Sequence, residues 1–511
     1  MKRIASLLIL LLILSACGTK KQLTNTEYTA IAERRDYLPQ KREFRGAWIP
    51  NAWRDEFQGK STAYIQGRLV ERLDLLKSLG FNAVIFQIRS EADAWYYSPY
   101  EPWSRTLTGR QGQAPSPLWD PLAFMVAECH KRDMELHAWI NPYRAATNVA
   151  NGTRALSPKH PYHSHPEWFF RYGRQLYFNP ALPEVTQYLC QVVDDIVERY
   201  DIDAIHLDDY FYPYPIAGEA LPDRPEFERN PKGFTDIREW RRDNVNRLIS
   251  LLHATIKARK PYVQFGISPF GIYRNQKSAP MGSQTNGLQN YDDLYADVLL
   301  WDAMGWVDYI VPQIYWEIGH KAADYTELAR WWGQNIGLAH YYIGQDVKRT
   351  QDRNQLHAKF NIANETARGV VMWPADELFK NYKEINRQLI NNYWLKPALI
   401  PPTNYPQGIR PFEEPERETS VVTHQGVATL YWEPDLPYPK GMETKYFVVY
   451  IHKRGEKLSK ATSQENLLAI TQNPFYPLPR IDGRQKVAFT ITRINRYNHE
   501  ILVAHNVKAK I

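Results

Sequence analysis

Short apolar runs alternate with amphipathic stretches along the chain from Phe44 onward. The eight runs are FRGAWI (44–49), NAVIFQIR (82–89), MELHAWIN (134–141), DAIHLDD (203–209), VQFGISP (263–269), VDYIVPQIYWE (307–317), AHYYIG (339–344) and GVVMWP (369–374). Between them apolar residues recur at helical spacing, as in LVERLDLLKSLG (69–80). Eight strand and helix units in alternation predict a closed α/β (β/α)₈ TIM barrel over residues 43–393. A doubly wound open sheet is the alternative, but the first run lacks the Gly-rich turn of such sheets.

The hydrophobic pattern changes after about Tyr393. Residues 394–414 are rich in proline and predict a linker that also packs on its neighbours. Residues 415–511 contain VATLYWEP, TKYFVVYIHK and KVAFTITRINRYNHE, which have the composition of strands and turn residues at sandwich spacing. They predict a small fibronectin type III-like β-sandwich. We expect it to be separable from the barrel and to act as a spacer or stabilising module rather than as a sugar-binding domain.

The first residues combine two basic side chains with an apolar stretch that is too short to span a bilayer stably. The sequence Leu-Ser-Ala-Cys follows directly and ends at Cys17. This pattern predicts a lipoprotein signal peptide over 1–16, acylation of Cys17, and a lipidated tether over 17–42. An ordinary signal peptide with a chance cysteine is the alternative. The lipoprotein interpretation places the protein in the cell envelope, on the outer membrane facing the periplasm, with the lipid as its only membrane contact.

Composition narrows the possible partners. The 511 residues are 44% hydrophobic, and a formal net charge of +7 is spread over the whole chain without a basic run that would suggest a nucleic-acid groove. Cys129 and Cys190 make neither a disulfide framework nor a metal site, and the 14 histidines show no metal-binding spacing. We therefore expect a monomer with no nucleic-acid partner, no metal and no cofactor.

Two adjacent carboxylates, Asp208 and Asp209, end the fourth run. Successive side chains of a barrel strand alternate between the interior and the helix layer. Ile205 and Leu207 suit the helix layer, so Asp208 should face inward at the carboxyl rim, where TIM-barrel active sites lie. Asp209 then stands where the strand leaves the barrel. The same parity brings Glu317, at the end of the sixth run, to this rim.

Polar and aromatic side chains from other runs and the turns after them should reach the same opening. The expected substrate-binding residues are Gln87, Arg89, Trp139, Asn141, Tyr143, His206, Tyr210, Gln313, Tyr315 and Trp373. Glycoside hydrolysis needs one carboxyl group to protonate the leaving oxygen and a second to act as nucleophile or base, and flat aromatic faces stack on sugar rings. The inventory predicts a glycoside hydrolase with Asp208 as nucleophile and Glu317 as general acid/base. Asp209 would position the sugar or tune its neighbour.

Each of these residues also has a structural interpretation. A rim aspartate can cap a helix or hold a loop, and inward histidines are often satisfied polar groups of a barrel interior. Glu91 and Asp376 are the next carboxyl candidates if the chemistry lies elsewhere on the rim.

Five ordered blocks carry a resemblance to a known family: FRGAWI, GFNAVIFQIRSEADAWYYSPYEPWS, HAWINPYR, IDAIHLDDYFYPYP and PQIYWE. Together they resemble the glycosyl-hydrolase-like family ten of bacterial lipoproteins, over roughly residues 43–393. The resemblance implies a (β/α)₈ barrel that acts on glycan, and peptidoglycan strands stripped of peptide stems are a known substrate among its members. Distantly similar barrels with a nucleophilic aspartate after strand four and an acid after strand six agree with the roles given above.

Three functions remain open at this point. The first is hydrolysis of the peptidoglycan sugar backbone by Asp208 and Glu317. The second is cleavage assisted by the substrate's own N-acetyl group, as in enzymes that resemble the hexosaminidases, with Asp208 and Asp209 orienting that group. The third is a non-catalytic glycan-binding lipoprotein on a barrel scaffold.

We predict that Cys17→Ser releases the protein from membranes, because the variant has no thiol to acylate. Fractionation of cells that express each form, with immunodetection of the protein in the membrane and soluble fractions, measures this. Retention of the variant in the membrane fraction would contradict the lipoprotein interpretation.

Overall fold

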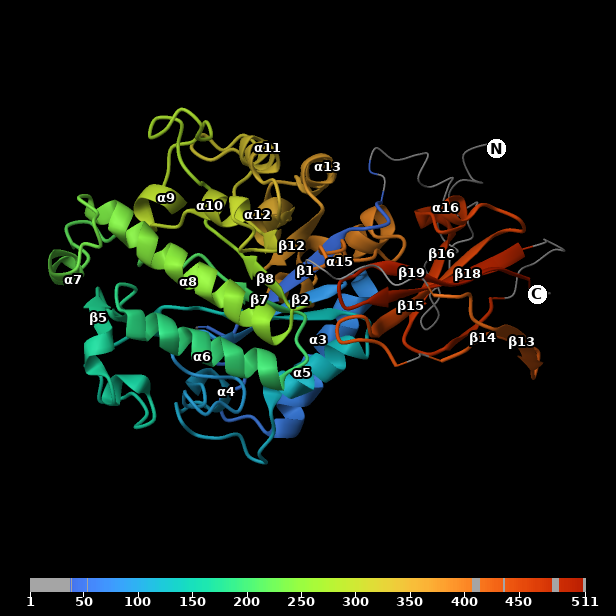
Figure 1. Cartoon of the computed structure of the whole chain (residues 1–511), viewed down its shortest axis with the longest axis horizontal. Coiled ribbons are helices and arrows are strands. Elements are labelled where there is room, and N and C mark those ends of the chain that lie inside the picture. The colour runs from blue at the N-terminus through green and yellow to red at the C-terminus, as the bar shows by residue number, and fades with distance from the viewer. Residues whose placement is uncertain are drawn as a thin grey trace.

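The computed structural model describes residues 37, 39–52, 54–406, 414–434, 437–479 and 487–508. Figure 1 shows a barrel surrounded by helices, with the C-terminal sheets at one side of it. The predicted signal peptide, Cys17 and most of the tether lie outside the described residues. In the described ranges, no helix combines the length and the apolar character needed to cross a bilayer.

Parallel strands form the barrel in the order β10-β9-β8-β7-β3-β2-β1-β12-β11. They are β1 (Phe44–Ile49), β2 (Ala83–Arg89), β3 (Glu135–Ile140), β7 (Ala204–Leu207), β8 (Gln264–Ile267), β9 (Tyr309–Ile310), β10 (His340–Tyr341), β11 (Ile343–Asp346) and β12 (Gly369–Trp373). Tyr342 alone separates β10, which pairs with β9, from β11, which pairs with β12. The two segments therefore fill one barrel position and bring the ends of the sheet together. Each of the eight predicted runs contains one of these positions, and the predicted barrel is confirmed.

Several strands are shorter than the runs that predicted them. β7 ends at Leu207, and β9 is only Tyr309–Ile310. Pro312 follows β9 closely and has no amide hydrogen to give to a strand ladder. Asp208 and Glu317 consequently lie in the segments after β7 and β9 rather than inside a strand.

Helices cover the outside of the barrel (Figure 1). The longer ones are α3 (Thr62–Leu79), α5 (Pro121–His130), α6 (Pro183–Arg199), α8 (Ile237–Arg259), α11 (Tyr325–Asn335) and α13 (Leu356–Thr366). Short helices are α4 (Arg105–Thr108), α7 (Arg224–Arg229), α9 (Asn290–Asp293), α10 (Val298–Ala303), α12 (Val347–Asp352), α14 (Ala375–Phe379) and α15 (Ile385–Gln388). α3 shows how local sequence sets the bounds, because the Ser61 side chain accepts a hydrogen bond from Tyr64 N at its start. Gly80 ends it at φ 92°, a conformation that favours glycine.

A small antiparallel sheet lies in the connection between β3 and α6. Its strands are β4 (Arg144–Ala146), β5 (Phe169–Tyr172) and β6 (Gln175–Phe178), in the order β4-β6-β5. β4 follows the carboxyl end of β3 closely. This sheet therefore builds up one side of the barrel mouth.

Alternate residues of the barrel strands belong to two different apolar clusters. Ile205 and Leu207 pack in the large cluster that the helices cover. Trp139 and Tyr309 belong to a second cluster that fills the barrel interior. This alternation matches the parity used to place Asp208, which follows Leu207 and takes the inward parity.

A chain of polar contacts runs along the barrel interior. Glu135 Oε2 lies 2.9 Å from His137 Nε2, and His137 Nδ1 lies 2.7 Å from the Tyr309 hydroxyl. The same hydroxyl lies 3.0 Å from His206 Nδ1, and Trp48 Nε1 donates to His206 Nε2 at 3.2 Å. The buried histidines are therefore satisfied polar groups.

Two antiparallel sheets follow the barrel. One has the order β13-β14-β17 and the other β16-β15-β18-β19. The strands are β13 (Thr419–His424), β14 (Val427–Trp432), β15 (Thr444–Lys453), β16 (Leu467–Thr471), β17 (Phe475–Pro477), β18 (Val487–Asn495) and β19 (Glu500–Lys508), and α16 (Leu458–Ala461) follows β15. Residues of both sheets share one apolar cluster that includes Leu430 and Phe489. A β-sandwich is therefore present, and its fibronectin type III-like character stays a prediction.

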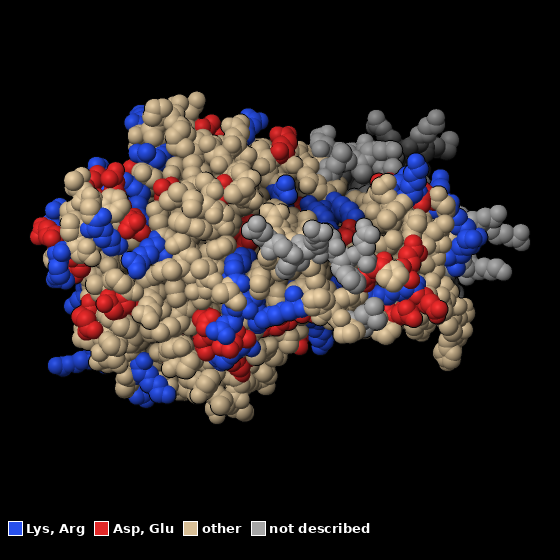
Figure 2. Space-filling view, viewed as in Figure 1, with Lys and Arg blue, Asp and Glu red and all other residues tan. Residues whose placement is uncertain are grey.

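The sandwich contacts the amino-terminal end of the barrel strands, here called the barrel foot. Lys445 Nζ lies 2.5 Å from Glu135 Oε1, at the start of β3, and 3.0 Å from Asp203 Oδ1, just before β7. The Lys445 side chain is only 7% exposed. Ile400, in the predicted linker, packs in the interior cluster of the barrel. Figure 2 shows basic and acidic side chains next to one another where the two bodies meet. The separable sandwich stays a prediction. These contacts indicate that its removal would lower stability, because two buried carboxylates would lose their lysine.

We predict that Lys445→Met lowers the free energy of unfolding by about 3–5 kcal/mol, the usual cost of removing one partner from a buried ion pair. Urea denaturation followed by tryptophan fluorescence measures it. Lys460→Met is the matched control, because Lys460 pairs with Glu456 at 3.7 Å on the surface with its side chain 66% exposed. Equal stability of the two variants would show that the foot does not depend on Lys445.

Candidate active site

Asp208 and Asp209 follow β7 at the carboxyl end of the barrel. Both are almost fully buried, with 4% and 2% of their surface exposed. Two like charges side by side at this depth are unfavourable when both are ionised, so their environments decide which one holds a proton.

Asp208 is held by nitrogen donors from β3 and the turn after it. Trp139 Nε1 donates to its Oδ2 at 3.1 Å, and Asn141 Nδ2 donates to its Oδ1 at 2.9 Å. Burial raises the pKa of Asp208 above its usual value, and the nearby Arg144 guanidinium and these two donors offset only part of the rise. Donors that surround a carboxylate favour its anionic form.

Asp209 lies in a different environment. The Tyr214 hydroxyl donates to its Oδ2, and this contact and the nearby Gln313 side chain oppose the rise of its pKa. Burial, followed by the charge of Asp208, raises the pKa of Asp209 to about 6. Asp209 is therefore the member of the pair that can carry a proton near neutral pH, which a general acid must do.

Aromatic rings line the barrel mouth beside this pair. Tyr315 stacks against Trp373 with ring centroids 6.3 Å apart and planes 11° apart. Trp139 and Trp48 meet the same indole edge-on at 6.1 and 6.3 Å. Trp373 and Tyr315 are only half-buried, so they offer the surface on which a sugar ring could stack.

Other predicted contacts lie below the mouth and support it. Arg89 is completely buried and forms two 2.7 Å hydrogen bonds to Glu101. Gln87 Oε1 accepts from two backbone amides in the turn after β1, at 2.9 and 2.7 Å. Both nitrogens of His206 are used within the interior chain, and Tyr143 is fully buried. These four side chains shape the walls of the barrel mouth. Tyr210 is half-buried, and the Arg144 guanidinium lies over its ring, 4.8 Å from the ring centroid.

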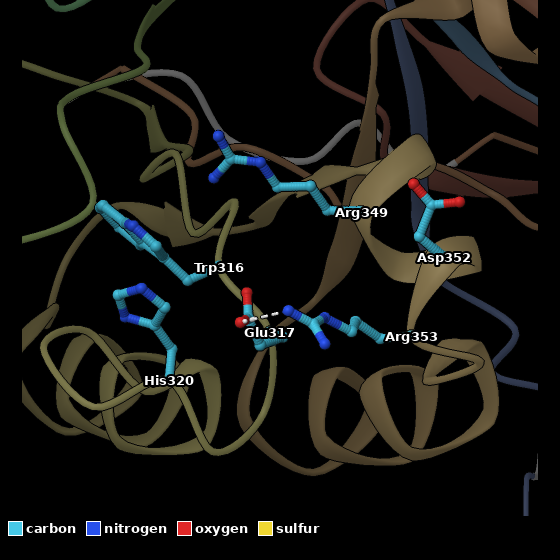
Figure 3. A pocket seen from close by; sticks show the side chains of 6 residues that line it. All are labelled: Trp316, Glu317, His320, Arg349, Asp352 and Arg353. Carbon is cyan, nitrogen blue, oxygen red and sulfur yellow. Dashed lines mark hydrogen bonds and ion pairs between the residues drawn. The ribbon is translucent and has the colours of Figure 1, made fainter.

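Glu317 lies in a separate hollow rather than with the aspartates. Arg353 Nη2 lies 3.3 Å from Glu317 Oε1, and Trp316 and His320 stand beside it (Figure 3). Its own backbone amide, and then the charge of Arg353, lower the pKa of the Glu317 carboxyl. A carboxyl group in this state is ionised near neutral pH, which does not suit a general acid. Its acid/base role stays a prediction, and the structure gives it no direct contact with Asp208 in the described residues.

Three residues at the barrel mouth were not among the sequence candidates. They are Arg144, Tyr214 and Asp346. Asp346 ends β11 and has the inward parity of a rim carboxylate, but the apolar run 339–344 stops two residues before it. Its Oδ1 accepts from Arg349 N at 2.7 Å, so it also caps α12. Tyr214 stands in the aromatic stretch after Asp209, where spacing alone does not show which ring folds back.

The next carboxyl candidates, Glu91 and Asp376, are engaged in other contacts. Glu91 accepts from Thr147 N at 2.9 Å and pairs with Arg105 at 2.9 Å. Asp376 pairs with Arg54 at 3.1 Å. Among the described residues, no three His, Cys, Asp or Glu side chains are grouped as a metal site requires.

The glycosyl hydrolase-like 10 family model matches residues 43–362. The chain belongs to this family. The glycosyl hydrolase YngK of Bacillus subtilis is 39% identical over 481 residues, which cover 90% of this chain and 92% of that protein. The glycosyl hydrolase DigH of Escherichia coli K12 is 36% identical over 334 residues, which cover 60% of this chain and 75% of that protein. This member of the glycosyl hydrolase-like 10 family is a glycoside hydrolase, and its substrate is a carbohydrate.

Solved glycosidase structures resemble the family member's fold at low identity. The catalytic domain of β-amylase from Paenibacillus polymyxa aligns with a TM-score of 0.47 and 12% identity, over 70% of this chain and 99% of that one. The glycoside hydrolase domain of PgaB from Bordetella bronchiseptica aligns with a TM-score of 0.45 and 10% identity, with the same coverage.

We predict that Asp209→Asn stabilises the protein at about pH 8 by up to about 3 kcal/mol, because each pKa unit corresponds to about 1.4 kcal/mol. The fold raises the pKa of Asp209 from 3.8 to about 6, so it favours the protonated form. The contribution of Asp209 is therefore complete below the unfolded pKa and is lost as pH rises through about 6. Asparagine stays neutral, so the gain should shrink towards pH 4 (roughly the unfolded pKa).

Urea unfolding at several pH values measures this difference. Asp236→Asn is the control, because the hydrogen bond from Arg238 lowers the pKa of Asp236 to about 2 and its removal should give no gain at alkaline pH. A constant difference between wild type and Asp209→Asn at every pH would contradict the raised pKa.

Proposed function

We propose that this glycoside hydrolase cleaves a β-linked amino-sugar polymer of the cell envelope, namely peptidoglycan glycan strands that lack peptide stems. We further propose that Asp208 and Asp209 act with the substrate's own N-acetyl group. The observation that carries the mechanism is the pair of adjacent buried carboxylates with different environments, one surrounded by N–H donors and one with a pKa of about 6.

The two aspartates divide the reaction between them. The acetamido oxygen of the bound sugar attacks the anomeric carbon, while protonated Asp209 gives its proton to the leaving oxygen and the glycosidic C–O bond breaks. Anionic Asp208 accepts a hydrogen bond from the acetamido N–H and stabilises the positive charge that develops on that group. Water then attacks the anomeric carbon, Asp209 takes back a proton, and the acetamido group is restored.

Direct displacement is the second candidate, with Asp208 as nucleophile and Glu317 as acid/base. The inward parity of Asp208 supports it. The Arg353 ion pair and the lowered pKa of Glu317 favour the first mechanism.

The substrate and the location form one proposal. The family resemblance and the sequence Leu-Ser-Ala-Cys that ends at Cys17 both support a site of action in the envelope. A lipid on Cys17 at the periplasmic face of the outer membrane would hold the barrel beside peptidoglycan.

We predict that Asp208→Asn and Asp209→Asn each lower sugar release from peptide-free peptidoglycan strands by about 10²- to 10⁴-fold, because each removes a group that acts in the transition state. Glu317→Gln should lower it far less. Removal of the N-acetyl groups from the strands should abolish cleavage by the wild type, since the nucleophile is then missing. Mass spectrometry of the released sugars measures all four.

The same assay separates the two mechanisms. Loss of turnover in Glu317→Gln together with near wild-type turnover in Asp209→Asn would support direct displacement. No release by the wild type would contradict the proposed substrate.

A further inference from the structure

A hollow of about 610 Å³ opens beside the barrel mouth (Figure 3). Trp316, Glu317 and His320 line it from the segment after β9, and Arg349, Asp352 and Arg353 line it from α12 and its end. The hollow therefore joins the loops of two neighbouring barrel positions on the carboxyl side.

A row of aromatic side chains connects the hollow with the aspartate pair. Tyr315 stacks on Trp373 at the mouth, and the next residue, Trp316, lines the hollow. Trp316 meets Phe270 edge-on at 5.5 Å, and Phe270 meets Tyr214 at 6.1 Å. The Tyr214 hydroxyl donates to Asp209. A polymer that fills the mouth can thus continue along this aromatic wall into the hollow.

Among the charged side chains of the hollow, Arg349 forms only a long ion pair in the part of the chain that the structure describes. Arg353 is paired with Glu317 at 3.3 Å, and Asp352 Oδ1 accepts from Tyr382 and Lys383 at 2.6 and 2.7 Å. The only ion pair that the described residues offer Arg349 is with Asp346 at 3.9 Å, and its side chain is 56% exposed. Figure 3 shows the Arg349 guanidinium reaching over the hollow towards Trp316.

We propose that the hollow is a subsite for a sugar residue that carries a carboxylate, with its ring on Trp316 and its carboxylate on the Arg349 guanidinium. A planar guanidinium binds a carboxylate through two parallel hydrogen bonds, and an indole face takes a sugar ring. Arg353, at the end of α12, is a second cation of the hollow and is paired with Glu317. A neutral sugar would leave Arg349 without this partner.

The inference rests on the proposed function and makes its substrate more specific. On peptidoglycan strands the carboxyl group of the lactyl ether is bound as an amide to the peptide stem, and it is free and anionic once the stem is removed. A subsite built for a carboxylate therefore selects stripped strands over strands that still bear peptides.

A matched pair of ligands tests the subsite by binding alone. The probes are oligosaccharides from peptide-free strands and the same oligosaccharides with every carboxyl group converted to a primary amide. Calorimetric titration uses the full chain with Asp208→Asn, which slows turnover under either proposed mechanism. We expect the carboxylated form to bind at least about tenfold more tightly than the amidated form, as a charge-assisted pair allows.

Arg349→Gln in the same background should reduce this preference to near unity, and Arg349→Lys should restore part of it. Arg330→Gln is the control, because Arg330 is exposed on α11 and does not line the hollow. Oligosaccharides of uronic acids form a third arm, which tells a general carboxylate site from one that requires the lactyl ether.

Equal binding of the carboxylated and amidated forms overturns the subsite, as does a preference that survives Arg349→Gln. These outcomes do not depend on catalysis. If peptide-free strands are bound with the expected preference but not cleaved by the wild type, the proposed function fails and the subsite stands.

Discussion

The Lys445 ammonium meets the buried carboxylates of Glu135 and Asp203 at the barrel foot, and the interior of the barrel depends on this contact. Burial by itself opposes ionisation, but Lys445 and His137 lower the pKa of Glu135, so Glu135 is a carboxylate that can only accept hydrogen bonds. His137 must then donate from Nε2 and accept at Nδ1 from the Tyr309 hydroxyl. Tyr309 in turn accepts from His206 Nδ1, which leaves Nε2 to accept from the Trp48 indole. One arrangement of protons satisfies the whole chain, and it fixes the Trp48 ring that stands against Tyr315 and Trp373 at the mouth.

Buried carboxylates are paired with a cation at the foot of the barrel but are incompletely compensated at its mouth. At the foot, Lys445 from the sandwich pairs with Glu135 and Asp203, and His130 pairs with Asp203 at 2.8 Å. At the mouth, Asp208 and Asp209 have donors and one nearby guanidinium, but Arg144 gives its Nε hydrogen to Ser90 O and stacks on Tyr210. Incomplete compensation keeps the pKa of Asp209 raised, and strongly shifted carboxyl groups of this kind are typical of sites that do acid/base chemistry. The stability that the foot provides allows the mouth to hold this unfavourable pair.

The barrel could be predicted because an apolar run stands at every barrel position. Asp208 could be placed at the carboxyl end because it directly follows Leu207, the last residue of β7. Sequence reasoning did not locate Glu317, which lies seven residues beyond Ile310, the last residue of β9, because side-chain alternation holds only while the backbone stays extended. Asp346 was missed for the opposite reason, since β11 continues two residues past the end of the apolar run. Lys445 could not have been found, because it reaches a carboxylate 310 residues away in the sequence, and periodicity shows which face of a strand is apolar but not what docks on its end.

The positions of the hollow and the aspartate pair also bear on which bond of a polymer is cut. Under the proposed mechanism the sugar at the mouth must carry an N-acetyl group, which both sugars of an alternating glycan strand can supply. The chemistry at Asp208 and Asp209 therefore cannot distinguish the two kinds of linkage. A carboxylate occurs on only one of the two sugars, so a strand whose carboxylated sugar is held by Arg349 is fixed in register relative to Asp209. Shifting it by one sugar would place a neutral ring against the guanidinium and lose that contact. Binding energy gained in the hollow thus selects the bond that the acid pair cleaves, because remote contacts can set position without taking part in the reaction.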